Sequence, residues 1–180
     1  MLTLPAPNAE ILARRAEIAT ALSQIVPGGV IADERALAAY DSDGLTAYRQ
    51  LPMIVTLPRS TQEVSQVLAY CAREKIRLVP RGAGTSLSGG ALGLADAVTI
   101  GLARMNRILS VDLDNRCVVA QPGVTNLAIS QAVRADGFYY APDPSSQIAC
   151  TIGGNVAENS GGVHCLKYGL TANNLLGVEL

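Results

Sequence analysis

A glycine-rich stretch between residues 77 and 93 carries residue types suited to binding an anion. A short apolar run, Leu78 to Pro80, leads into a loop whose glycines accept unusual backbone angles and let the main chain approach a ligand. Successive N–H groups of such a loop form a concave anion site, with the charge of Arg81 at its edge. A phosphate or pyrophosphate is the expected ligand. The alternative interpretation of the stretch is a flexible connector that binds nothing. The glycines are Gly82, Gly84, Gly89 and Gly90, and the neighbouring hydroxyls belong to Thr85, Ser86 and Ser88.

The two common phosphate-loop motifs do not fit this stretch. A Walker A loop requires Lys and then Ser or Thr after its last glycine, whereas Gly90 and Ala91 follow Gly89 here. A dinucleotide fingerprint would place its third glycine where Leu87 stands. It would also open a helix, which the Ser-Gly-Gly sequence at 88–90 disfavours. A phosphate bound by this loop would therefore be held by another class of site.

A second glycine-dense region runs from residue 141 to residue 162. Pro142 and Pro144 stiffen a turn around Asp143, and two glycine pairs, at 153–154 and 161–162, bracket a segment rich in Asn and Ser. Such a segment offers N–H groups and amides while leaving room for a flat ligand, although a simple loop with glycine corners has the same composition. The two regions, about 70 residues apart, fit one extended ligand touched at both ends.

Composition excludes several classes of protein. The chain of 180 residues is 49% apolar and 16% charged, which is typical of a globular domain rather than a disordered one. A net charge of −1, scattered basic residues and 4% aromatics argue against nucleic-acid binding. Four cysteines without a CxxC pair and a single histidine favour reduced thiols and no zinc site. With no signal peptide and no apolar run of about 18 residues, we expect a soluble, cytoplasmic protein with no transmembrane segment.

The first 50 residues are predicted to form a helical arm packed on the main domain. Residues 8–26 keep an approximate helical spacing that Pro27 and two glycines end, and Asp33 is a plausible cap for a short helix over 33–40. The Asp-Ser-Asp-Gly turn at 41–44 marks the expected boundary. The adjacent Arg14 and Arg15 are expected on a solvated helix face.

Residues 51–180 are predicted to form the main domain. A strand at 53–57, a helix opened by a Ser60–Glu63 capping box and a strand at 77–79 form a strand–helix–strand unit, which usually builds a parallel pair. This order places the first loop at the carboxyl end of a strand, where α/β sheets bind ligands. The later elements expected are a strand at 97–102, a hairpin of 108–111 with 117–120, a helix from the Thr125 cap through Val133, and a short strand at 138–140.

Three motifs together resemble a known family. The segments Pro-Arg-Gly-Ala-Gly-Thr-Ser-Leu-Ser-Gly-Gly at 80–90, Pro-Asp-Pro-Ser-Ser at 142–146 and Thr-Ile-Gly-Gly-Asn-Val-Ala-Glu-Asn-Ser-Gly-Gly at 151–162 resemble the FAD-binding domain of the vanillyl-alcohol-oxidase, or PCMH, type. Within it, the chain is most similar to the branch of bacterial glycolate oxidase and D-lactate dehydrogenase, from about residue 1 onward. The resemblance implies an α+β fold: a small parallel βαβ subdomain plus part of a mixed or antiparallel sheet with helices.

The resemblance also assigns roles along one FAD molecule. The stretch from Arg81 to Ser86 would wrap the pyrophosphate, the segment at 142–154 would line the dinucleotide, and that at 159–161 would lie near the isoalloxazine ring. Some relatives attach the flavin through a His just after the loop glycines, where Thr85 stands here, so noncovalent FAD is expected. The implied cofactor residues are Arg81, Gly82, Ala83, Gly84, Thr85, Ser86, Pro142, Asp143, Ser145, Ser146, Thr151, Gly153, Gly154, Asn159, Ser160 and Gly161.

The activity implied is oxidation of a 2-hydroxy acid, glycolate or D-lactate, to the 2-oxo acid. Family members continue into a cap domain, so this chain is expected to be a C-terminally incomplete piece whose catalytic residues lie elsewhere. His164 is expected to have a packing role rather than to act as a general base. Implied partners are the iron–sulfur and second flavin subunits of a glycolate oxidase complex, which would bring the protein to the inner membrane. A non-catalytic nucleotide-binding module and a cell-wall precursor reductase of the same superfamily are the alternatives.

Overall fold

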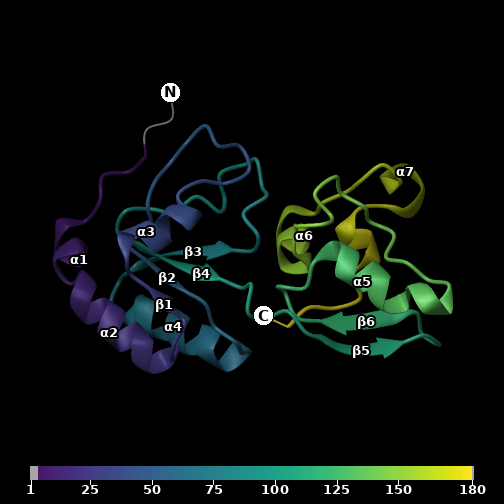
Figure 1. The fold of residues 1–180 in the computed structure, drawn as a ribbon, viewed down its shortest axis with the longest axis horizontal. Coiled ribbons are helices and arrows are strands. Elements are labelled where there is room, and N and C mark those ends of the chain that lie inside the picture. The colour runs from purple at the N-terminus through teal and green to yellow at the C-terminus, as the bar shows by residue number, and fades with distance from the viewer. Residues whose placement is uncertain (1–3, 180) are drawn as a thin grey trace. The chain divides into compact units, whose positions relative to one another are not determined.

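The structure is a computed structural model, and it describes residues 4–179. The contacts divide the chain into two compact units, Met1–Arg104 (unit 1) and Met105–Leu180 (unit 2). In Figure 1 the colour changes from purple and blue in unit 1 to green and yellow in unit 2. Each unit has its own sheet and its own helices.

Unit 1 is built on a four-stranded sheet of order β1-β2-β4-β3. Its strands are β1 (Val30–Ile31), β2 (Ile54–Thr56), β3 (Arg77–Arg81) and β4 (Ala97–Gly101). β4 runs parallel to both β2 and β3, whereas β1 is antiparallel to β2. The strands near 54 and 78 are therefore parallel, as predicted, but they do not pair directly, because β4 lies between them. Every residue of β4 is buried, as expected for a central strand covered on both faces.

The helices of unit 1 largely follow their local signals. The predicted helix at 8–26 is two helices, α1 (Ala9–Ala13) and α2 (Arg15–Ile25), broken at Arg14. The short helix α3 (Glu34–Leu37) and the 3-10 turn η1 (Ala38–Tyr40) follow, and Asp33 caps α3 as predicted. α4 (Thr61–Arg73) begins at Ser60, whose hydroxyl accepts from the N–H of Glu63 at 3.2 Å. The Glu63 carboxylate accepts from the N–H of Arg59 and not from the N–H of Ser60, so the second hydrogen bond of the predicted capping box is shifted by one residue.

The first 50 residues contribute directly to the core of unit 1. Ile18 and Leu22 of α2 are completely buried, in one cluster with Ile54 of β2, Val67 of α4 and Val98 of β4. β1 extends the same sheet. The contacts therefore divide the chain after Arg104 and place the predicted arm in the same unit as the first sheet. A domain boundary near residue 50 stays a prediction.

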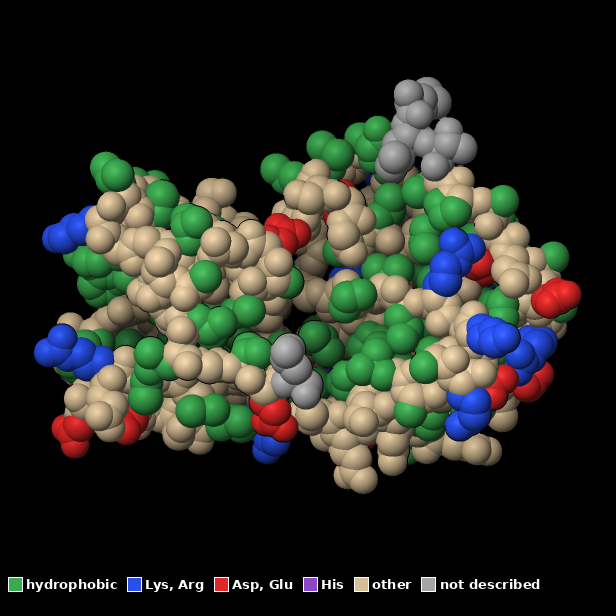
Figure 2. Space-filling view, turned by 180° about the vertical axis from the view of Figure 1, so that it is seen from behind, with side chains coloured by type: hydrophobic (Ala, Val, Ile, Leu, Met, Phe, Trp, Pro, Cys, Tyr) green, Lys and Arg blue, Asp and Glu red, His purple; other side chains and the backbone are tan. Residues whose placement is uncertain are grey.

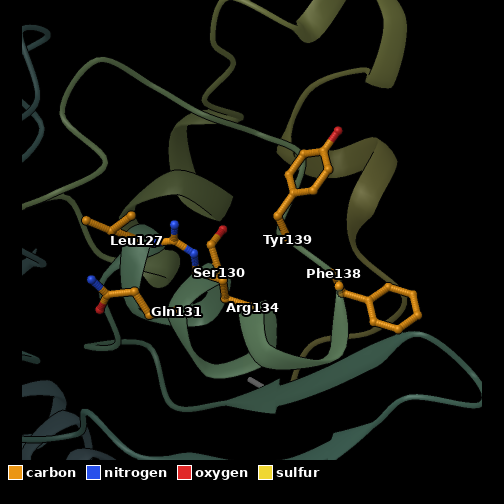
Figure 3. A pocket seen from close by; sticks show the side chains of 7 residues that line it. Leu127, Ser130, Gln131, Arg134, Phe138 and Tyr139 are labelled. Atoms are coloured by element: carbon orange, nitrogen blue, oxygen red, sulfur yellow. The ribbon is translucent and has the colours of Figure 1, made fainter.

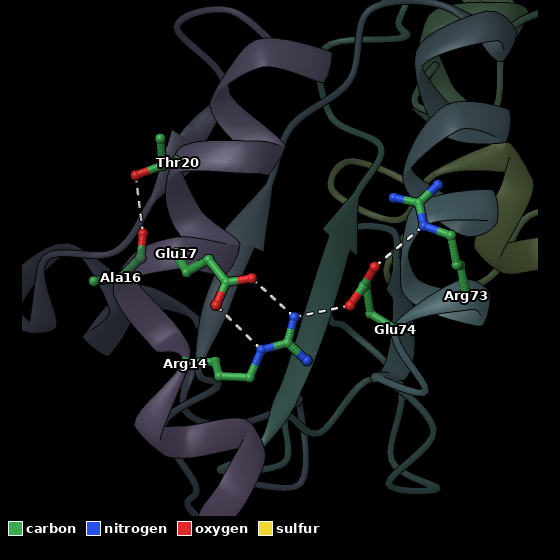
Figure 4. A network of polar contacts seen from close by, with 6 residues as sticks. All are labelled: Arg14, Ala16, Glu17, Thr20, Arg73 and Glu74. Carbon is green, nitrogen blue, oxygen red and sulfur yellow. Dashed lines mark hydrogen bonds and ion pairs between the residues drawn. The ribbon is translucent and has the colours of Figure 1, made fainter.

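The two adjacent arginines at the α1–α2 break are not on a simple solvated face. Arg14 pairs with Glu17 at 2.9 Å and with Glu74 at 2.8 Å, and Glu74 also contacts Arg73, so the network links α2 to the end of α4 (Figure 4). The Arg15 guanidinium donates to the carbonyl oxygens of Met53 and Ala32. These contacts join the first helices to the sheet, which the sequence pattern did not indicate.

Unit 2 contains an antiparallel hairpin and several short helices. The hairpin pairs β5 (Ile108–Asp112) with β6 (Cys117–Ala120), as predicted. α5 (Asn126–Val133) begins at Thr125, whose hydroxyl accepts from the N–H of Ala128, and the turn η2 (Arg134–Asp136) ends at Gly137 in the left-handed conformation. The remaining elements are α6 (Ile152–Glu158), α7 (Cys165–Tyr168) and η3 (Thr171–Asn174).

Two predictions for unit 2 are wrong. Residues 138–140 form no strand, and the N–H of Tyr140 bonds to the hydroxyl of Ser130 in α5. The segment at 151–162 was expected to be an open loop, but most of it is the helix α6, whose end at Asn159 has a φ of +52°. Gly153 allows this because its position lies directly against Pro122, and a Cβ there would come within 2.7 Å of the proline ring. Gly153 therefore serves the close packing of a helix rather than a loop corner, whereas a Cβ at Gly154 would only touch the Thr151 hydroxyl at 3.5 Å.

The surface of unit 2 carries exposed apolar side chains. Figure 2 shows green side chains at the surface, with acidic and basic side chains intermingled. On the hairpin these are Leu109, Val111, Leu113 and Val119, which are 38–56% exposed. Across residues 4–179, every helix is too short or too polar to cross a lipid bilayer.

Candidate functional site

The glycine-rich loop of unit 1 follows the last residue of β3, at the carboxyl end of the parallel strands. The backbone N–H groups from Gly82 through Leu87 have no hydrogen-bond acceptor among the described residues. The following N–H groups are used, since Ser88 donates to the Ser86 hydroxyl and Gly89 donates to Asp43. Consecutive unpaired N–H groups on a concave loop are the arrangement that binds an anion. The structure leaves these N–H groups free for a ligand, and the binding of an anion by them stays a prediction.

Arg81 supports this loop from beneath. Its side chain is buried, and its guanidinium donates to the carbonyl of Ala91 at 3.0 Å while lying 5.7 Å from the centre of the Tyr40 ring. Burial lowers the pKa of Arg81, an effect that the nearby Tyr40 and Asp43 oppose. The charge predicted at the edge of the loop is thus buried beneath it, where it binds the carbonyl of Ala91 at the far end of the loop.

Gly84 has a conformation and a position that other residues would not tolerate. Its φ is +73°, in the left-handed region, and a Cβ at this position would overlap the Arg81 guanidinium. Gly89 has a φ of +80°, but open space surrounds it. Of the two loop glycines with a positive φ, Gly84 is therefore the one at which both the backbone angle and the available space require glycine.

In unit 2 the predicted Pro142–Ser146 segment forms a turn held at several points. The buried amide of Asn126 donates to the carbonyl of Pro142 at 3.0 Å, and the carbonyl of Pro144 accepts from the N–H of Gln147 at 2.8 Å. Ser145 is exposed, and Ser146 accepts backbone bonds from Ala149 and Cys150 through its carbonyl. The segment is therefore rigid along its backbone and keeps the Ser145 side chain at the surface.

Asp143 has a partner that the sequence did not reveal. Nδ1 of His164 lies 2.7 Å from one carboxylate oxygen, and the backbone N–H of His164 donates to the other at 3.3 Å. The His164 hydrogen bond lowers the pKa of Asp143 below its usual value. Gly162 lies against the same residue, because a Cβ there would overlap the Asp143 carbonyl. The contact joins the turn assigned to the cofactor to a residue outside the assigned segments, and no local sequence signal links residues 21 positions apart.

The residues predicted near the flavin ring pack against the turn η3. The Asn159 side-chain oxygen accepts from the N–H of Ala172 at 2.9 Å, and the carbonyl of Ser160 accepts from both the N–H and the hydroxyl of Thr171. A Cβ at Gly161 would overlap Leu170. These contacts shape the segment, and its place beside the isoalloxazine stays a prediction.

Buried polar atoms at the junction of α5 and α6 lack partners among residues 4–179. They are the Asn126 side-chain oxygen, the Thr151 hydroxyl and the Asn155 side-chain nitrogen. Thr151 is among the residues predicted to line the dinucleotide. Unpaired buried polar groups are costly and usually bind an ordered water or a ligand group. The junction therefore has unused hydrogen-bonding capacity close to the predicted lining residues.

A separate open pocket of about 550 Å³ lies on unit 2 beside α5. Figure 3 shows its lining side chains, among which Arg134 is the single charged group. The lining residues are Leu127, Ser130, Gln131, Arg134, Gly137, Phe138 and Tyr139. None of the predicted cofactor residues lines this pocket, so it does not coincide with the predicted site.

Comparisons with known proteins agree with the loop and the fold. The glycolate oxidase subunit GlcD of Escherichia coli is 53% identical over 167 residues, which cover 92% of this chain and 34% of that protein. The mitochondrial D-2-hydroxyglutarate dehydrogenase of Bos taurus is 36% identical, over 89% of this chain and 29% of that protein. The structure of 4-ethylphenol oxidase from Gulosibacter chungangensis has a TM-score of 0.73 and 27% identity, covering 89% of this chain and 31% of the oxidase.

The chain spans about a third of the length of the relatives it matches. The family model described as "FAD binding domain" matches residues 52–180, which include the glycine-rich loop and both predicted segments of unit 2. The α+β architecture with parallel strands before the loop is the fold expected of that family. The chain thus belongs to the family of FAD-binding domains of the vanillyl-alcohol-oxidase type, and its cofactor is FAD.

Proposed function

We propose that the N–H groups from Gly82 through Leu87 hold the diphosphate of FAD. The observation that supports this proposal is that these N–H groups have no hydrogen-bond acceptor in the described chain, while the buried Arg81 places a positive charge beneath them. Each N–H bond to a charged phosphate oxygen contributes about 1.5–3 kcal/mol. Gly84 keeps the main chain open for a close approach. The side chains of Thr85 and Ser86 add donors at the rim of the loop.

The remaining predicted residues would line the dinucleotide and the ring. The segment at 142–146 and Thr151, Gly153 and Gly154 are proposed to follow the dinucleotide, with 159–161 near the isoalloxazine. Gly153 would act through helix packing, because Pro122 fills the space beside it. We also propose that residues 51–180 form the FAD domain to which the first 50 residues contribute a strand and a core helix.

The proposed reaction is oxidation of a 2-hydroxy acid, glycolate or D-lactate, to the 2-oxo acid. Its support is that the relatives are named for glycolate and D-2-hydroxyglutarate. Bound FAD supplies the capacity to accept two electrons from such an alcohol carbon. This chain's part is to bind the dinucleotide and fix its position. The residues that hold the acid are proposed to lie in the part of the relatives that this chain does not span.

The cofactor is expected to be held without a covalent bond, because Thr85 stands where some family members have a histidine. FAD added to the protein should co-elute with it and should be released completely into the supernatant by acid precipitation. Absorbance of the supernatant and of the washed pellet measures the two fractions. Flavin that remains in the pellet would contradict noncovalent binding. A protein that binds no FAD would overturn the proposed site.

The substrate proposal is tested by anaerobic addition of glycolate or D-lactate to the FAD-loaded chain. We expect the visible flavin band to persist, while dithionite bleaches it, because the acid-binding residues are proposed to lie elsewhere. The matched reference is the glycolate oxidase subunit GlcD of Escherichia coli, of which this chain spans about a third, and one of the two acids should bleach its flavin. Bleaching of the 180-residue chain would place the reacting groups within it, and a GlcD subunit that neither acid reduces would overturn the substrate class.

The named relatives also suggest an assembly. We propose that the complete protein is one subunit of a complex with an iron–sulfur subunit and a second flavin subunit, since one relative is itself named a subunit. A cytoplasmic position at the inner membrane, reached through those subunits, is part of the same proposal.

A further inference from the structure

The turn between residues 41 and 46 lies against the glycine-rich loop. One carboxylate oxygen of Asp43 accepts from the N–H of Gly89 at 2.9 Å, and the other accepts from the N–H of Leu45 at 3.0 Å. The N–H of Gly44 donates to the carbonyl of Ser86 at 2.9 Å. Asp43 is 7% exposed, although its sequence context indicated only a surface turn at a boundary. The turn thus holds the loop at two points across more than 40 residues of chain.

Gly44 leaves no space between the turn and the loop. A Cβ at this position would lie 2.6 Å from the carbonyl oxygen of Thr85 and 3.0 Å from that of Ser86. Both carbonyls of the loop therefore face the turn. A side chain of any size at residue 44 would have to push them away.

The direction of these carbonyls sets the direction of the ligand-facing N–H groups. A trans peptide is planar, and its C=O and N–H point in opposite directions. No cis peptide is present in the described chain. Because the carbonyls of Thr85 and Ser86 face the turn, the N–H groups of Ser86 and Leu87 face away from it. These two N–H groups belong to the unpaired series.

We propose that Asp43 and Gly44 are positioning residues of the anion-binding loop: Gly44 holds the carbonyls of the loop to one side, and Asp43 holds the N–H of Gly89 at the end of the loop. The inference rests on the proposed binding of the FAD diphosphate at that loop. Asp43 cannot be replaced by its amide without loss, since Asn has one acceptor oxygen for two N–H donors. Replacing either residue should weaken the contacts of the protein to the diphosphate. The contacts to the rest of the cofactor should be unchanged.

The test compares FAD with riboflavin, which has the same ring and no phosphate, by quenching of flavin fluorescence. Asp43→Asn and Gly44→Ala should each weaken FAD binding about tenfold, the equivalent of one hydrogen bond to a charged group. Riboflavin binding should not change. Circular dichroism in urea reports whether each variant is folded.

Two control variants separate positioning from a general loss of stability. Gly90→Ala adds a methyl group to the same loop where a Cβ meets nothing within 4 Å, so FAD binding should be unchanged. Asp96→Asn removes a buried carboxylate that contacts Arg77 and the N–H of Asn8 just before β4, at the opposite end of the strands from the loop. It should lower the urea midpoint and leave the FAD affinity of the folded protein intact.

The possible results separate the positioning role of Asp43 and Gly44 from the proposed FAD site on which it rests. A wild-type chain that binds no FAD overturns the proposed site and the positioning role together. A wild-type chain that binds FAD, with Asp43→Asn and Gly44→Ala binding it equally well, overturns the positioning role alone. Equal losses for FAD and riboflavin, or a loss shared by Asp96→Asn, would assign the effect to stability and would also overturn it.

Discussion

Replacing Gly84 by valine is expected to weaken FAD binding by about a hundredfold while the fold is retained. The new side chain would sit at a φ of +73°, where a β-branched residue costs about 1–3 kcal/mol, and its Cβ would overlap the Arg81 guanidinium. To relieve the backbone strain and the overlap with Arg81, the loop would have to move, and its N–H groups would then no longer point at the diphosphate. Fluorescence titration with FAD measures the loss, and circular dichroism reports the fold.

The matched control for Gly84 is Gly89, which has a φ of +80° and open space around it. Gly89→Val introduces the same backbone strain without the overlap, so its effect on FAD affinity should be clearly smaller. If both variants lose binding equally, backbone strain alone explains the result and the contact with Arg81 has no role. If Gly84→Val unfolds the chain, Gly84 is a structural turn residue, and the ligand role assigned to it is wrong.

Truncating Leu22 is expected to destabilise unit 1 by about 3 kcal/mol, the usual cost of removing a fully buried leucine. Leu22 lies in α2 and is 0% exposed, in one cluster with Ile54 and Cys71. Leu22→Ala should therefore open the sheet region and not merely loosen an N-terminal arm. Burial raises the pKa of the Cys71 thiol to about 11, so its alkylation in the native state is slow and reports this opening.

The measurement is the rate of Cys71 alkylation, followed by peptide mass spectrometry, together with a urea titration. Leu68→Ala on α4 is the control, because Leu68 is 44% exposed and should cost well under about 1 kcal/mol. Faster labelling of Cys71 in Leu22→Ala, but not in Leu68→Ala, is the expected pattern. Unchanged Cys71 protection in Leu22→Ala would show that the first 50 residues are an independent arm.

Several elements follow from signals contained within a few residues, and these could be predicted. Ser60 and Thr125 each cap the helix that follows, as their hydroxyls must when N–H groups at a helix start lack partners. The hairpin between β5 and β6 follows from two apolar runs around a polar turn. The unpaired N–H groups of the loop follow from its glycine density. In each case the interaction that decides the structure is local.

Other features depend on partners that local patterns cannot specify. Strands β2 and β4 are both buried at every residue, so burial did not indicate which is central, and the place of β4 between β2 and β3 became clear only from the assembled sheet. The segment at 151–162 reads as a loop because glycine disfavours helices, yet Gly153 fits a helix packed on Pro122. Tertiary packing overrides the local preference there.

The sequence by itself determined the family, the glycine-rich loop and most helices and strands of this protein, because these depend on residue types at short spacing. Only the tertiary structure decided what holds the site in shape. Arg81 turned inward beneath the loop, Asp43 bonded to Gly89, and His164 bonded to Asp143. Each of the last two contacts joins residues more than 20 positions apart. Such pairs form when burial brings two segments together, and the free energy that selects them belongs to the whole fold.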